Sequence, residues 1–130
     1  MLEYAISSHA EKIINMLTDF VNTHHLVEGM TIADKDGLPL VSFFHQEAQE
    51  EALAAISPVI MKDLSSLSLG EVRYLIAMGK DNFAVIKPLD QSTYLAMYSR
   101  FDIWKGLVGQ QEIMADFEEL SARILRLAGK

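Results

Sequence analysis

Four histidines are the first residues to test for chemistry, because imidazole nitrogens bind transition metals. His24 and His25 are adjacent, and His9 and His45 lie elsewhere in the chain. In a helix over 8–25, neighbouring side chains point about 100° apart, so His24 and His25 face different directions. No acidic metal-binding motif accompanies them. We therefore expect His24 to complete the apolar face of a helix and the others to be surface residues, with no metal or other cofactor bound.

The run Asp34-Lys35-Asp36-Gly37 places carboxylates at the spacing that opens a calcium-binding loop. The rest of such a loop is missing, because no third oxygen ligand precedes Gly37 and no glutamate closes the loop. Asp-Gly is instead a strong hairpin signal, since glycine accepts the positive φ that tight turns require. The Asp34 carboxylate is expected to accept hydrogen bonds from the turn backbone. The sequence therefore predicts a structural turn formed by Asp34, Asp36 and Gly37.

Serine nucleophiles and nucleotide-binding loops also lack the necessary spacing. No Gly-x-Ser-x-Gly turn is present, and no His–acid pattern accompanies the central serines: Ser42, Ser57, Ser65, Ser66 and Ser68. No Gly-x-x-x-x-Gly-Lys loop occurs either, so we expect the chain neither to bind nor to hydrolyse GTP. Neither serine catalysis nor nucleotide binding is therefore supported by the sequence.

The elements that position these residues follow from hydrophobic periodicity. Apolar residues spaced three or four apart predict three helices: 8–25, 46–67 and 103–127. Turn-bounded apolar runs predict a hairpin and three further strands: 27–44, 71–78, 82–88 and 93–99. The strands are apolar at both odd and even positions, so helices must cover both faces of the sheet. We expect one α+β domain over 1–130, with three α/β/α layers, a five-stranded antiparallel sheet, one helix on one face and two on the other.

The segment 46–67 has more apolar surface than one sheet can cover. Three acidic residues crowd its first turns and suit the positive end of a helix: Glu47, Glu50 and Glu51. The remainder is apolar on nearly every side, and such a helix needs two burying surfaces. The sheet supplies one, and a partner molecule would supply the other, approaching closely over the small side chains of Ala52 and Ala55. Pro58 predicts a kink or a split near Ser57.

Composition narrows the range of partners. The chain has 11 Lys and Arg against 18 Asp and Glu, a formal net charge of −7, so phosphate backbones repel it and nucleic acid is not an expected partner. No basic cluster leads into an apolar run at the N-terminus, and no apolar stretch reaches the roughly 20 residues that span a bilayer. We expect no signal peptide and no membrane insertion. The absence of cysteine suits a reducing cytoplasm, where we expect the protein.

The element order, with the run 31–40 (TIADKDGLPL), resembles the roadblock family, also called the dynein light-chain roadblock type. In that family an alanine-rich helix follows the hairpin, and a Leu-Gly-Glu-like entry leads into the third strand. Here 52–55 (ALAA) and 69–71 (LGE) occupy those places. The likeness spans about 26–99, with a helix on each side, and implies a roadblock-like fold of the profilin and longin type. Pro58 departs from the family's uninterrupted second helix.

The resemblance implies a non-catalytic homodimer that binds a Ras-like small GTPase or serves as a scaffold in motor or signalling complexes. Similar proteins in bacteria and archaea are paired with a gliding or polarity GTPase and can be GTPase-activating, reshaping the GTPase without donating an arginine. The second helix and third strand of each subunit would meet their counterparts through six residues expected at the dimer interface: Ala52, Ala55, Ile56, Val59, Val72 and Tyr74. Two alternatives stay open: a small-molecule sensor domain of profilin-like architecture, and an adaptor subunit of a motor or signalling assembly.

Overall fold

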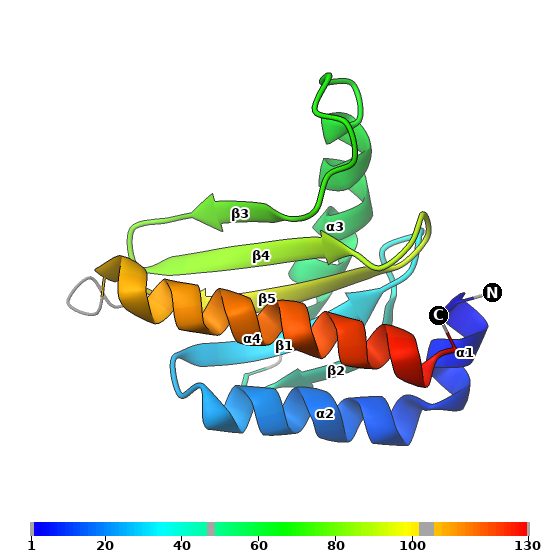
Figure 1. Ribbon diagram of the computed structural model, residues 1–130, viewed down its shortest axis with the longest axis horizontal. Coiled ribbons are helices and arrows are strands. Elements are labelled where there is room, and N and C mark those ends of the chain that lie inside the picture. The colour runs from blue at the N-terminus through cyan, green and yellow to red at the C-terminus, as the bar shows by residue number, and fades with distance from the viewer. Residues whose placement is uncertain (1, 47–48, 102–105, 130) are drawn as a thin grey trace.

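A five-stranded sheet forms the middle layer of the molecule (Figure 1). The computed structural model describes residues 2–46, 49–101 and 106–129. The strands are β1 (Val27–Ala33), β2 (Pro39–Phe44), β3 (Leu75–Met78), β4 (Asn82–Pro88) and β5 (Tyr94–Arg100). They lie in the order β2-β1-β5-β4-β3, and each neighbouring pair is antiparallel. The predicted five-stranded antiparallel sheet is confirmed.

Helices cover both faces of this sheet, as the two-sided apolarity of the strands predicted. The described helices are α1 (Leu2–Ser8), α2 (Ala10–Thr23), α3 (Glu50–Leu64) and α4 (Gly106–Leu127). One apolar cluster joins α1, α2 and α4 to one face of the sheet, and a second cluster joins α3 to the other face (Figure 1). The α/β/α layering is confirmed. No helix in the described part of the chain is both long enough and apolar enough to cross a membrane.

The predicted first helix, 8–25, is wrong in its bounds, because the chain forms two helices that meet at His9. His9 has φ −112° and ψ 23°, outside the helical region, and its Nδ1 lies 2.9 Å from the carbonyl oxygen of Ala5. The turn lets α1 bury Leu2 and Ile6 in the same cluster as α2. The helical periodicity of the sequence therefore continues through the break, since both pieces cover the same core.

A tight turn between β1 and β2 is held by Asp34. Asp34 is buried, and its Oδ1 accepts the N–H groups of Asp36 at 2.8 Å and Leu38 at 3.0 Å, while its carbonyl accepts the N–H of Gly37 at 3.1 Å. Gly37 has φ +80°, a conformation that L side chains rarely adopt. A Cβ built on Gly37 would lie only 2.9 Å from the Cα of Ala55. The turn therefore packs directly on the backbone of α3.

The split that Pro58 predicted does not occur, because α3 runs without interruption from Glu50 to Leu64. Pro58 has no N–H to donate to the carbonyl of Ala54, so the helix loses one hydrogen bond there. The hydroxyl of the buried Ser57 donates to the carbonyl of Leu53 at 2.7 Å in the preceding turn. Packing of one helix face on the sheet outweighs the lost bond, as tertiary contacts supply most helical stability in proteins. The helix is shorter than the predicted 46–67, and residues 47 and 48 lie outside the described chain.

Gly37→Ala should destabilise the fold more than Gly70→Ala, which serves as the matched control. Both glycines have positive φ, +80° and +74°, so both substitutions incur the left-handed backbone cost of about 1–2 kcal/mol. Only the Cβ at position 37 also meets backbone, whereas nothing lies within 4 Å of a Cβ at position 70. Urea unfolding should therefore show a larger loss for Gly37→Ala. Equal losses for the two variants would contradict the packing of this turn on α3.

Candidate protein-interaction surface

Most apolar side chains that the fold leaves exposed gather in one region. Ten large apolar residues are exposed among the described side chains, and three of these belong to other elements: Tyr4 on α1, Ile14 on α2 and Leu38 in the β1–β2 turn. The other seven belong to α3, β3 and the segment that joins them: Ile56, Val59, Leu67, Leu69, Tyr74, Ile76 and Met78. Single exposed apolar residues are ordinary on protein surfaces, whereas a continuous group marks a site of association.

The outer face of α3 supplies the first part of this surface. Leu53, Ala54, Ser57 and Met61 are buried towards the sheet. Because a helix turns about 100° per residue, the opposite face carries the four α3 residues that the sequence predicted for the interface: Ala52, Ala55, Ile56 and Val59. All four are exposed, with Ile56 at 47% and Val59 at 57%. The subunit thus leaves one apolar face of α3 uncovered.

The open edge of the sheet supplies the second part. β3 is the last strand and pairs on one side with β4, and no described strand lies along its other side. It begins at Leu75 rather than at 71 as predicted, so Val72 and Tyr74 precede the strand. Tyr74 is exposed, whereas Val72 is partly buried against the cluster under α3. An apolar strand with an open edge is a ready template for pairing with another chain.

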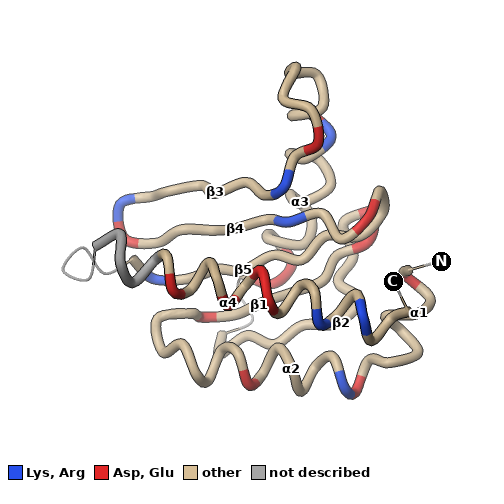
Figure 2. Tube along the Cα trace, in the orientation of Figure 1, with Lys and Arg blue, Asp and Glu red and all other residues tan. Residues whose placement is uncertain are grey.

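We call the exposed apolar residues of the helix and the strand the α3–β3 surface: Ala52, Ala55, Ile56, Val59, Tyr74, Ile76 and Met78. Ile76 and Met78 pair with Val85 and Phe83 of the α4-side cluster, so they lie on the sheet face opposite α3 and the surface continues around the edge of β3. No charged residue occurs in 52–61 or in 74–78. Figure 2 shows β3 free of charge along its length, with basic residues near its two ends. Desolvating this surface would therefore bury no ion, which suits a tight protein–protein contact.

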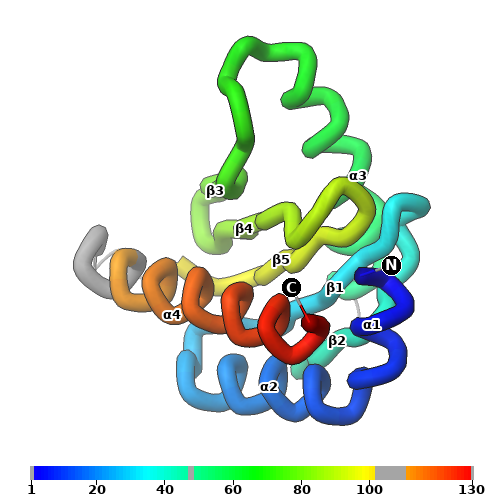
Figure 3. The backbone as a smooth tube through the Cα atoms, turned by 45° about the vertical axis from the view of Figure 1, so that its right-hand side comes forward, coloured from blue at the N-terminus to red at the C-terminus, as the bar shows by residue number. Residues whose placement is uncertain are grey.

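Residues 65–71, which we call the arm, project beyond the sheet. The last turns of α3 and the arm extend past β3, and both views show this overhang (Figures 1 and 3). Leu67 and Leu69 on the arm are 55% and 60% exposed. Sequence reasoning missed the arm, because it extended the helix to 67 and the strand back to 71.

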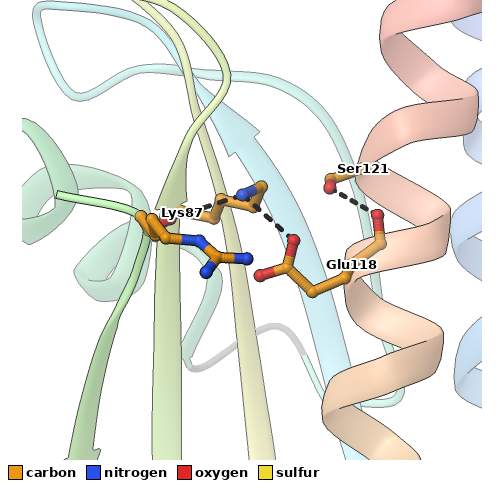
Figure 4. A network of polar contacts seen from close by, with 4 residues as sticks. Lys87, Glu118 and Ser121 are labelled. Carbon is orange, nitrogen blue, oxygen red and sulfur yellow. Dashed lines mark hydrogen bonds and ion pairs between the residues drawn. The ribbon is translucent and has the colours of Figure 1, made fainter. Parts of the chain in front are cut away.

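Lys87 of β4 holds in place the segment that leads into β3. Its Nζ lies 3.2 Å from Oε2 of Glu118 on α4 and donates to the carbonyl of Arg73 at 3.4 Å (Figure 4). Ser121 donates to the Glu118 carbonyl one turn along α4 at 2.7 Å. The other carboxylate oxygen of Glu118, Oε1, is buried and has no hydrogen-bond partner among the described residues. One lysine therefore ties α4, β4 and the segment before β3 together.

The histidines take structural places. Nε2 of His24 lies 2.9 Å from Oδ2 of Asp116, and its ring stands 4.5 Å from the ring of Phe20, so it links α2 to α4. His25 and His45 are exposed, while His9 is half-buried between α1 and α2. Within the described ranges, no group of three or more His, Cys, Asp or Glu side chains gathers closely enough to hold a metal ion.

A hollow of about 1140 Å³ separates the end of α3 and the arm from the β4–β5 turn. Several polar groups in its wall already have partners: Lys87 pairs with Glu118, and Asp90 Oδ1 accepts three hydrogen bonds within its own turn. Tyr94 donates to the carbonyl of Gln91 at 3.3 Å. Burial, and then the Asp90 carboxylate, raise the pKa of Tyr94, so its phenol stays neutral. A small-molecule site needs converging polar groups that are available to bind a ligand. Because several polar groups of this hollow already have partners within the chain, the hollow does not favour a small-molecule sensor.

Solved structures of low sequence identity share this architecture, although no family model and no curated protein matches the sequence. MglB with a tetrameric arrangement is 13% identical, with a TM-score of 0.75 over 92% of this chain and 90% of that one. The gliding protein MglB from Thermus thermophilus is 14% identical, with a TM-score of 0.67 over 88% and 89%. A Roadblock/LC7 domain from Streptomyces avermitilis is 12% identical, with a TM-score of 0.60 over 88% and 89%. The fold that the resemblance implied is confirmed.

Lys87→Met should destabilise the protein by about 1–2 kcal/mol, because it leaves the partly buried Glu118 carboxylate without its cation. Lys80→Met, at an exposed position after β3, is the control and should change little. The double variant Lys87→Met/Glu118→Met should recover part of the loss, since it removes the unpaired charge as well. Urea unfolding measures all three variants. A Lys87→Met protein as stable as Lys80→Met would show that the pair contributes nothing.

Proposed function

We propose that this chain of the roadblock fold is a non-catalytic homodimeric regulator or scaffold that binds a Ras-like small GTPase in the cytoplasm. The observation that carries the proposal is the α3–β3 surface, since α3 leaves an apolar face uncovered and β3 leaves an open strand edge. A surface of this kind requires a partner, and a second copy of the chain presents the matching half.

Self-association suits the geometry of this surface. A strand edge pairs antiparallel with its own copy across a two-fold axis, which joins two five-stranded sheets and removes the exposed edge. The overhanging end of α3 then lies over the sheet of the second copy instead of over solvent. The small side chains of Ala52 and Ala55 allow the two α3 helices to approach closely, and Ile56 and Val59 fill the space between them.

A GTPase as the partner is supported by the roadblock resemblance and by the absence of GTP-binding and serine-nucleophile motifs from the sequence. The roadblock resemblance implies binding of Ras-like GTPases, and one structural neighbour is named a gliding protein, MglB. The sequence has no Gly-x-x-x-x-Gly-Lys loop and no Gly-x-Ser-x-Gly turn. We infer that the chain acts by contact, either holding the GTPase in an assembly or stabilising the GTPase conformation that hydrolyses GTP.

Ile56→Glu should convert the dimer to a folded monomer. The side chain is already half exposed in the subunit, so the charge costs little there, whereas the two-fold interface would bury two unpaired carboxylates. We expect the dimer dissociation constant to rise about 100-fold or more, since each 1.4 kcal/mol is a factor of ten. Light scattering measures the mass, and circular dichroism checks the fold. Ile14→Glu, an exposed isoleucine on α2, is the matched control and should stay dimeric. A monomeric wild-type protein at micromolar concentration would overturn the proposed dimer.

The wild-type protein should bind a Ras-like GTPase from its own cell in the GTP-bound form. Purified GTPases are loaded with a slowly hydrolysed GTP analogue or with GDP, and binding is measured by calorimetry. Hydrolysis of GTP is then followed with and without the protein. Faster hydrolysis supports a GTPase-activating regulator, and binding at an unchanged rate supports a scaffold. Neither binding nor a rate change with any GTPase of the cell would contradict the proposal.

A further inference from the structure

We propose that the arm is a clasp that packs Leu67 and Leu69 on a second copy of the chain, beyond the open edge of β3. The inference rests on the proposed homodimer and adds to it a contact that the α3–β3 surface does not include. Residues 65–71 of each copy would then close over the sheet of the other, so the dimer would carry two clasps related by the two-fold axis.

The arm leucines have no cover within their own subunit. Neither Leu67 nor Leu69 belongs to either of the apolar clusters on the two faces of the sheet. A Cβ built on Gly70, beside them, would meet no atom within 4 Å. The arm therefore stands clear of the described chain while presenting two large apolar side chains. Burial of such side chains is favourable, and on a projecting segment only another molecule can bury them.

The arm is nevertheless held in shape by local hydrogen bonds. The hydroxyls of Ser65 and Ser66 donate to the carbonyls of Lys62 and Asp63 at 2.6 Å and 2.8 Å. The N–H of Leu67 donates to the carbonyl of Leu64 at 3.0 Å, and the N–H of Leu69 to that of Leu67 at 2.9 Å. At the base of the arm, Leu64 and Val72 are partly buried against the cluster under α3. A projection that is already shaped loses less conformational entropy when it binds.

The direction of the arm identifies the second copy as its occupant. The arm leads into the N-terminal end of β3 and overhangs the open edge of that strand (Figures 1 and 3). In an antiparallel two-fold pairing, that end lies beside the C-terminal end of β3 in the other copy. Ala77 and Met78 form this end, and both are exposed. Ala77 pairs with Ala84 and therefore lies on the sheet face of α3, the helix from which the arm continues. The arm of one copy thus faces the end of β3 in the other, where apolar surface continues the proposed interface.

The absence of cysteine from the sequence allows a direct test by disulfide cross-linking. Leu69→Cys and Ala77→Cys chains with different tags are co-expressed, purified under reducing conditions and then oxidised. We expect a disulfide between the two different chains. Leu69→Cys paired with Ile14→Cys, whose cysteine lies on α2, is the control and should give none. A mixed disulfide no more abundant than in this control would overturn the clasp.

The double variant Leu67→Ser/Leu69→Ser gives a second measurement. Its subunit should fold normally, because both side chains are exposed already, while the dimer dissociation constant should rise about tenfold or more. Tyr4→Ser, at an exposed tyrosine on α1, is the control and should dimerise like the wild type. An unchanged constant for the double variant would overturn the clasp, as would loss of GTPase binding with dimerisation intact, which would assign the arm to the GTPase.

These outcomes separate the clasp from the proposed function. A wild-type dimer in light scattering, with no cross-link from the arm, rejects the clasp and leaves the homodimer in place. A monomeric wild-type protein rejects both, because the clasp needs a second copy. A cross-link from the arm together with the weaker dimer of the double variant supports both.

Discussion

The packing of α3 on the sheet is the contact on which the rest of the structure depends. The helix is apolar on two sides, and the sheet can cover only one of them. Leu53 and Met61 face the core, so Ile56 and Val59 must face outward. The β1–β2 turn, which approaches the helix backbone at Gly37, limits how far α3 can shift. Because the helix also extends past β3, uncovered apolar side chains occur both on the outer face of α3 and along the open edge of the sheet.

The β3 edge of the α3–β3 surface is positioned from the face of the sheet opposite α3. Lys87 reaches from β4 to Glu118 on α4 and to the carbonyl before β3, so the strand edge and the α4 layer share one ion pair. Glu118 has a buried carboxylate oxygen without a partner among the described atoms, so its energy depends strongly on that lysine. A movement of α4 would therefore change the support of β3, although α4 lies on the face away from α3.

Periodicity in the sequence was sufficient to predict the layers, the strands and the two-sided character of α3. It could not reveal the break at His9, because α1 and α2 cover the same core and share one helical periodicity of apolar residues. The split expected at Pro58 does not occur, since tertiary packing maintains the helix through a lost hydrogen bond. Local patterns also could not pair Lys87 with Glu118, which lie on different elements and meet only in the folded chain. The arm was missed because its leucines continue the apolar patterns of the elements on either side.

The use of α3 and β3 for self-association would limit where a GTPase can bind. What remains for a partner is the layer of α1, α2 and α4, the β2 edge of the sheet, and any surface that the two copies create together. A GTPase has no two-fold symmetry, so a site on the dimer axis accepts one molecule per dimer and a site away from the axis accepts two. The stoichiometry of such a complex would therefore distinguish a GTPase that contacts both subunits of the dimer at once from one that contacts each subunit separately. Only in the first case would the apolar surface of α3 be required for recognition as well as for assembly.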